Sequence, residues 1–183
     1  SLADAGAIVR GLARLGVTAD LPEHLVAAHT GAGLGQREAT ALASLLDAAV
    51  LVGAGEAALA LTIGHVIERE QFGAPLAAIP AVTSWIARMR MQLDLAVESY
   101  DRALEIAGDG LLAPGADSAA SRVGEEAAGS PTAEAEAVGA SGTGITDAQA
   151  AAALSAKAIA AQAGGLIAAQ AHQLHGAIGI TAE

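Results

Sequence analysis

Cysteine is absent from this chain of 183 residues, and aromatic side chains are scarce, with one Trp, one Tyr and one Phe. A chain without cysteine has no disulfides, no Cys-ligated zinc or iron–sulfur site and no thiol nucleophile. Strands pack a pleated face with aromatic and β-branched side chains, so this composition argues against a β-sandwich or barrel. The long alanine runs favour helix instead, because alanine loses no side-chain entropy there.

Basic residues are also few, since nine Lys and Arg stand against 20 Asp and Glu and give a formal net charge of −11. This charge repels phosphate backbones, so we expect no nucleic-acid partner. The first residues, Ser1 to Asp4, do not form a positively charged segment followed by an apolar one, and no signal peptide is predicted. Because the absence of cysteine fits a reducing compartment, we expect a cytoplasmic location.

The mean hydropathy of +0.46 raises the question of membrane spans. The two most apolar stretches are residues 39–65 and 148–171. Asp47 and Glu56 interrupt the first stretch, while Lys157 and several glutamines interrupt the second. Alanine is also a weak lipid-facing residue, so we expect two buried helices and no membrane span.

Residues 1–36 form an N-terminal segment or connector, in which a short helix is predicted at residues 3–15 and glycine breaks the pattern from residue 31. Residues 37–183 are expected to form one helical domain. Apolar residues at three- and four-residue steps predict long helices at residues 37–70, 81–107 and 147–175, with Asp147 as an N-cap. The predicted fold class is all-α, an up-down helical bundle.

Each long helix carries a predicted packing stripe. The stripe of the first helix ends in small residues, which allow close approach of another backbone, and the second helix carries the clearest one, with the Tyr100 hydroxyl at its edge. The predicted members on the first helix are Leu42, Leu46, Ala49, Gly53, Ala57, Ala60 and Gly64. On the second helix they are Val82, Ile86, Met89, Leu93, Val97, Tyr100 and Leu104. The third helix carries two stripes, one of Leu154, Ala158, Ala161 and Gly165 and one of Gln162, Leu166, Gln170 and Gln173. Between the first two helices, Gly73 is expected to end the first and Pro75 suits a loop.

A segment at about residues 108–147 differs in kind, because it is rich in Gly, Ala, Ser, Pro and acidic residues. Such a stretch cannot bury enough apolar surface to offset its ordering entropy. We therefore predict a low-complexity insertion there, a surface loop or disordered segment that is unusually long for a compact domain.

Two short segments carry the candidate chemistry, and both lie where a predicted helix meets a turn. The first is Arg-Glu-Gln-Phe-Gly-Ala-Pro-Leu at residues 69–76. The second is Gln-Leu-His-Gly-Ala-Ile-Gly-Ile-Thr-Ala-Glu at residues 173–183. A turn after a helix can present a guanidinium and free backbone N–H groups to an anion, and glycine permits close approach.

In this order, the two segments resemble the C-terminal helical domain of the FAD-dependent acyl-CoA dehydrogenases, which carries R-x-Q-F-G-x-P-[LI] and later Q-x-x-G-G-x-G-[YF]-T-x-E. The resemblance covers about residues 38–107 and 148–183. It implies a flavoprotein domain for the α,β-dehydrogenation of acyl-CoA thioesters, with FAD at a subunit interface of a homo-oligomer or hetero-oligomer. The matching cofactor-binding positions, with Arg69 at the pyrophosphate and Phe72 near the adenosine, are Arg69, Phe72, Gln173, Leu174, His175, Gly176 and Ala177.

The chain departs from the family pattern where the chemistry needs it most. Ile79 and Pro80 replace a Phe-Gln pair, and Ala177 replaces the second glycine of the second segment. The family places its catalytic base beyond the second segment or, in a minority, at the position of Ala43 beside Ser44, and neither of these can abstract a proton. We therefore predict no catalytic residue here, an inactive chain when alone, and FAD that the isolated chain does not retain.

Simpler interpretations stand beside these. Arg69 can cap the C-terminus of a helix, where a cation is favoured. Phe72 and Trp85 are more often core anchors than ligand platforms. As a whole, the chain can instead be a non-catalytic helical subunit or a structural bundle without a cofactor.

The remaining titratable residues predict no further site. His172 and His175 are three residues apart at a helix end, but no third ligand is evident, so no metal site is predicted. Asp47 and Glu56 lie within apolar helix, where a polar outer face is expected rather than a general base.

Overall fold

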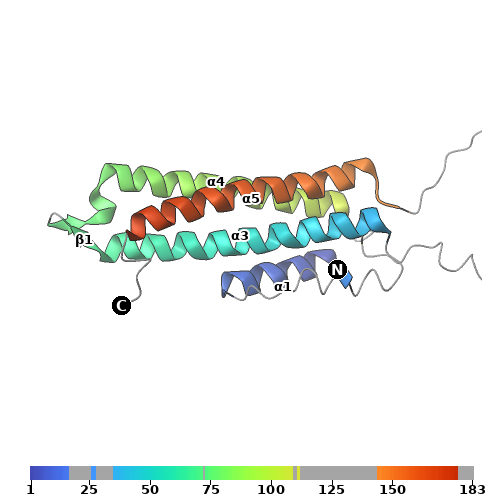
Figure 1. Ribbon diagram of the computed structural model, residues 1–183, viewed down its shortest axis with the longest axis horizontal. Helices are drawn as coiled ribbons and strands as arrows, with labels where there is room; N and C mark the ends of the chain where they lie inside the picture. Colours follow the sequence, from blue (N-terminus) through green and yellow to red (C-terminus); the bar gives the residue numbers. More distant parts are fainter. Residues whose placement is uncertain (17–25, 28–34, 72, 109–110, 112–143, 177–183) are drawn as a thin grey trace, which may run out of the picture.

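The three long helices lie side by side and run in alternating directions, with a shorter one along the first half of the earliest of them (Figure 1). The computed structural model describes residues 1–16, 26–27, 35–71, 73–108, 111 and 144–176. The helices are α1 (Leu2–Arg14), α3 (Gln36–Glu68), α4 (Pro80–Ala107) and α5 (Asp147–His175). The all-α, up-down bundle is confirmed.

Local sequence explains where these helices begin. Ser1 accepts a hydrogen bond on its hydroxyl oxygen from the backbone N–H of Asp4 at 3.3 Å, which starts α1. Pro80 occupies the first position of α4, where its missing N–H costs nothing. The N-cap of α5 is Thr146 and not the predicted Asp147, because Thr146 and Gln149 form a reciprocal capping box.

A short hairpin joins α3 to α4. It consists of β1 (Glu70–Gln71) paired antiparallel with β2 (Ala74–Pro75), followed by a 3-10 turn, η1 (Leu76–Ala78). Gly73 lies in the hairpin turn with φ of 81° and does not end the preceding helix, which stops at Glu68. The prediction for Gly73 was therefore wrong, since its positive φ serves the turn.

Two hydrophobic clusters fill the bundle, one at each end. The cluster at the α1 end includes Tyr100, whose hydroxyl is buried and has no hydrogen-bond partner among the described residues. This corrects the prediction that the hydroxyl lies at the edge. The cluster at the hairpin end consists of Leu59, Val66, Leu76, Val82, Met89, Leu93, Ile167 and Leu174.

The stripe predictions succeeded to different degrees. On α4 every predicted member is buried or half-buried, but Trp85 is 38% exposed and is not a core anchor. On α3 the predicted members are buried as far as Gly53, after which the buried face passes through Leu59 and Val66. On α5 the prediction was wrong, because the buried residues are Ala153, Ala156, Ala160, Ala163, Ile167 and Leu174. Because alanine occurs on every face of α5, the sequence alone does not indicate which face is buried.

Helix α1 packs closely on α3. A Cβ atom at Gly53 would lie 2.3 Å from the carbonyl oxygen of Arg10, so the two backbones nearly touch. Arg10 also forms an ion pair with Glu56 through two hydrogen bonds, and both side chains are largely buried. Glu56 therefore faces α1, which corrects the expected polar outer face. Asp47 is half-buried and pairs with Lys157 of α5 at 2.7 Å.

The segment predicted as an insertion lies mostly outside the described residues, and its character stays a prediction. Its described ends are fixed to the bundle, because Leu111 and Ile145 are buried. The backbone N–H of Ile145 also donates to a carboxylate oxygen of Glu38 at 3.1 Å. Both ends of the segment therefore emerge at the α1 end of the bundle (Figure 1).

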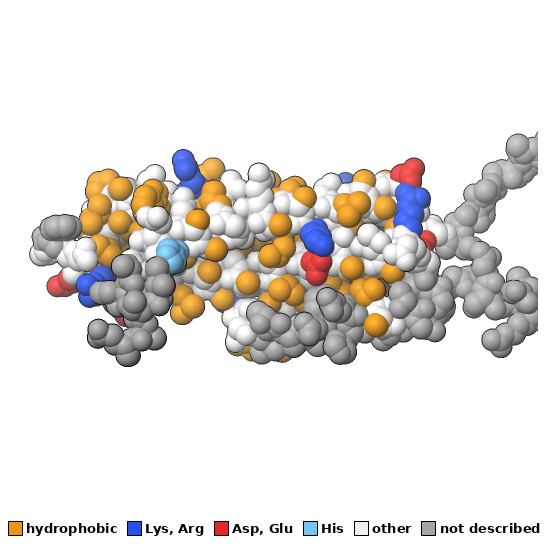
Figure 2. Space-filling model, in the orientation of Figure 1, with side chains coloured by type: hydrophobic (Ala, Val, Ile, Leu, Met, Phe, Trp, Pro, Cys, Tyr) orange, Lys and Arg blue, Asp and Glu red, His pale blue; other side chains and the backbone are white. Residues whose placement is uncertain are grey.

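Among the described residues, α3 and α5 are long and apolar enough to cross a membrane by length and composition. This is weak evidence, because a core helix of a bundle passes the same test, and α3 and α5 pack against each other. Figure 2 shows hydrophobic side chains scattered over the face that these helices present, with few charged groups among them.

Candidate functional site

The described residues of the first segment, 69–71 and 73–76, and of the second, 173–176, lie at the hairpin end of the bundle (Figure 1), where Leu76 and Leu174 belong to the same buried cluster. The first begins where α3 ends, and the second begins in the last turn of α5. His65 in the last turn of α3 stacks on His175 in the last turn of α5, with ring centroids 4.3 Å apart and ring planes 22° from parallel. Residues more than a hundred positions apart are thereby brought into one neighbourhood.

Arg69 has a fixed backbone and an exposed side chain. Its backbone N–H donates to the carbonyl oxygen of His65 at 2.9 Å, and its own carbonyl oxygen accepts from the N–H of Leu76 at 2.8 Å. Among the described residues, no hydrogen bond or ion pair engages its guanidinium. Arg69 occupies the C-cap of α3, as the simpler interpretation expected, yet its donors stay available to an anion.

The described part of the second segment divides between core and surface. Leu174 is 7% exposed and belongs to the hairpin-end cluster, so its side chain faces the core. Gln173 is exposed and His175 is half-buried. Gly176 caps α5 with φ of 71°, and a Cβ atom there would meet no heavy atom of the described residues within 4 Å.

A shallow pocket of about 320 Å³ adjoins this region, and its walls all come from the last two turns of α5. The walls are Ala168, Ala171, His172 and His175. Two candidate positions of the sequence, Phe72 and Ala177, lie outside the described residues.

Electrostatics at this end centre on the histidine pair. Burial lowers the pKa of His175, and the neighbouring His65 lowers it further, because two imidazolium rings in contact repel. No signal in the sequence could have paired His65 with a residue so distant.

The positions considered for a catalytic base supply none. Ala43 is half-buried on α3, and Ser44 is 2% exposed with its hydroxyl donating to the carbonyl oxygen of Thr40 at 2.8 Å. In the part of the chain that the structure describes, no group of three or more His, Cys, Asp or Glu side chains could hold a metal ion.

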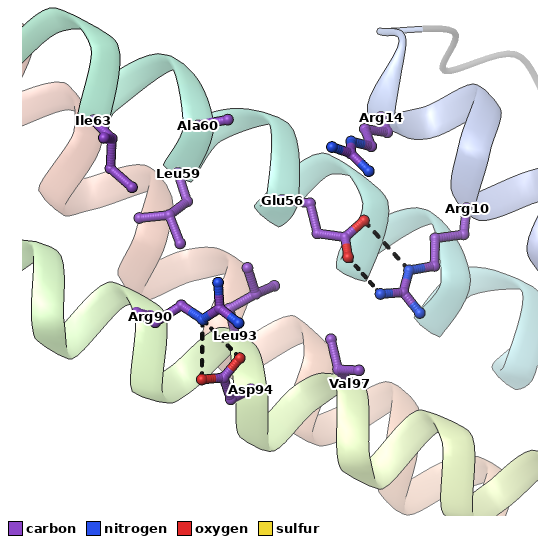
Figure 3. Close-up of a pocket in the computed structure, with 10 residues that line it drawn as sticks. All are labelled: Arg10, Arg14, Glu56, Leu59, Ala60, Ile63, Arg90, Leu93, Asp94 and Val97. Carbon is purple, nitrogen blue, oxygen red and sulfur yellow. Dashed lines mark hydrogen bonds and ion pairs between the residues drawn. The ribbon is translucent and has the colours of Figure 1, made fainter.

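A second pocket, of about 300 Å³, lies between α1, α3 and α4 (Figure 3). Arg10 reaches from α1 to Glu56 on α3, and Arg90 pairs with Asp94 within α4. Its arginines are thus largely engaged, and none of the candidate cofactor residues lines it. The pairing of Arg10 with Glu56 was also missed in the sequence, because neither residue belongs to a recognisable pattern.

Comparison with known proteins identifies a family for most of the helical bundle. The family model described as acyl-CoA dehydrogenase, C-terminal domain, matches residues 38–147. This range contains α3, the hairpin with Arg69 and α4, whereas residues 173–176 lie beyond it. No curated protein and no solved structure matches the chain.

Proposed function

Because this chain belongs to the acyl-CoA dehydrogenase family, through that family's C-terminal helical domain, we propose that it helps to hold FAD at an interface between subunits. The assembly would carry out the α,β-dehydrogenation of acyl-CoA thioesters. Bound FAD would supply the hydride acceptor for that reaction. The observation that carries the proposal is that Leu76 of the first segment and Leu174 of the second are buried in the same cluster at the hairpin end of the bundle.

The described residues at this end fit an anionic cofactor. The unengaged guanidinium of Arg69 is a fork-shaped donor suited to a pyrophosphate. Gly176, with its positive φ, permits a ligand to approach the backbone, and the exposed amide of Gln173 adds a donor and an acceptor. Leu174 would act indirectly, by anchoring the end of α5 in the core.

The proposal places the catalytic base and most of the acyl-CoA pocket outside this chain. Neither Ala43 nor Ser44 can take the proton from the α-carbon, and the Ser44 hydroxyl is already committed to Thr40. We therefore expect the chain alone to show no dehydrogenase activity. Its partner would be a dehydrogenase subunit, either a second copy or a different chain.

The test is the flavin content of the native assembly with Arg69→Gln. We expect the variant to lose FAD affinity by about tenfold or more, because a charge-assisted bond to phosphate is removed. Arg88→Gln is the matched control, since Arg88 is an exposed arginine on α4 outside the candidate site. Equal FAD affinity in the two variants would remove Arg69 from the site, and an assembly without flavin would support the structural bundle instead.

A further inference from the structure

His65 and His175 form a direct side-chain contact between the ends of α3 and α5, and their rings are stacked. Arg69 follows His65 by one helical turn, and Gly176 follows His175 directly. The backbone of Arg69 is itself bonded to His65, because its N–H donates to the His65 carbonyl oxygen. The imidazole stack therefore lies between the two segments proposed to meet the cofactor.

Among the described residues, few other charged groups lie near the pair in the chain. They are Glu68 at the end of α3, Arg69 directly after it, Glu70 on β1 and His172 on α5, and all four are exposed. η1 carries no charged residue, and the first one on α4, Arg88, is more than two turns into that helix. Exposed charges are screened by solvent, so burial and His65 are the main influences on the charge of His175.

Protonation of both rings changes their interaction from attractive to repulsive. Two neutral rings, or one neutral and one charged, attract when stacked. Two imidazolium rings at 4.3 Å repel, and the burial that lowers the pKa of His175 adds to the cost of the doubly charged state. The stack is thus favourable near neutral pH and unfavourable below it.

We propose that His65 is a positioning residue, which holds His175 and Gly176 beside Arg69 while at least one ring of the pair is neutral and releases them when both rings are protonated. This inference rests on the proposed FAD site, because it assigns that site a positioning contact and a dependence on pH. No atom of His65 needs to touch the cofactor. Its effect reaches the site through His175.

The first arm of the test uses the chain without any cofactor. An NMR titration of the imidazole protons follows His175 in the wild type and in His65→Phe, which keeps an aromatic ring but cannot be charged. We expect the pKa of His175 to rise in His65→Phe, because the repelling partner is gone. His172→Gln is the matched control and is expected to leave the pKa of His175 unchanged. Identical titration of His175 in His65→Phe and in the wild type would overturn the inference.

The second arm measures FAD affinity in the native assembly as a function of pH. We expect His65→Ala to weaken binding about fivefold at neutral pH through loss of the stack. His65→Phe should restore the affinity and remove the decline that we expect in the wild type at acidic pH. A purely structural role would give the same pH profile in the wild type and in His65→Phe.

The two arms separate this inference from the proposed function. If Arg69→Gln weakens FAD binding but His65→Ala does not, the positioning role is wrong and the FAD site stands. If the assembly binds no FAD while the titration still couples the two rings, the FAD site is wrong and the positioning role fails with it.

Discussion

Replacing Gly53 by alanine is expected to destabilise the protein, although the same change is normally stabilising inside a helix. Alanine is favoured over glycine by about 0.5–1 kcal/mol in a helix interior. At Gly53, however, the new Cβ would lie 2.3 Å from the Arg10 carbonyl oxygen and 3.1 Å from the Cβ of Ala13. The first contact is with backbone, which cannot rotate away, so α1 must shift outward.

The size of the effect follows from what α1 buries. Leu2 and Val9 are each 2% exposed, so complete undocking of α1 would cost about 3–6 kcal/mol. A shift of roughly an ångström costs less, about 1–3 kcal/mol in the usual range for overpacking. After the gain in helix propensity is subtracted, Gly53→Ala should lower the free energy of unfolding by about 1–2 kcal/mol.

Gly64→Ala is the matched control, because Gly64 lies on the same helix and an added Cβ would meet nothing within 4 Å. It should raise the free energy of unfolding by up to about 1 kcal/mol. Urea unfolding followed by far-ultraviolet circular dichroism measures both variants. Opposite signs are expected, and a stabilising effect at Gly53 would refute the close packing of α1 on α3.

Three further changes test the packing. Glu56→Gln removes the nearer charge partner of Arg10 and leaves only Asp101, at 4.0 Å, among the described residues. It should lower the free energy of unfolding by about 1–2 kcal/mol in urea, and a smaller loss would indicate that α1 is not docked on α3. Met89→Ala opens a cavity at the hairpin end and should cost about 2–5 kcal/mol in the same assay, whereas Met89→Leu should be nearly neutral. Tyr100→Phe should be neutral or stabilising at pH 7, because it removes a buried hydroxyl with no partner among the described residues. Burial raises the pKa of Tyr100 to about 12, so above pH 10 the unfolded state loses this proton while the folded state keeps it. The wild type should therefore become less stable as the pH rises above 10, and Tyr100→Phe should not show this decrease in an alkaline unfolding experiment.

The sequence predicted the helices well because their boundaries have local causes. Pro80 begins α4 and glycine follows α5, and apolar spacing on α4 marks one face clearly. On α5 the same reasoning failed, since small apolar residues cover every face and only contact with α3 and α4 selects the buried one. Strand pairing over two residues leaves too short a pattern to recognise, so the hairpin after Arg69 was expected only as a turn.

At the candidate site, the sequence identified the two segments, and the structure adds what joins them. Arg69 and Gln173 belong to recognisable segments, whereas His65 belongs to none. The stack of His65 on His175 depends on the relative rotation of α3 and α5, which long-range packing decides. For the same reason, the sequence predicted an outer, solvent-facing position for Glu56. Its partner Arg10 is apparent only once α1 is packed against α3.

The most direct test of the account is the visible absorbance spectrum of this chain, isolated in its native assembly from cells that produce it. The account predicts the absorbance of oxidised FAD, lost in Arg69→Gln and retained in Arg88→Gln. An assembly that carries no flavin in any of the three forms would contradict the proposal that this helical domain holds a cofactor at an interface.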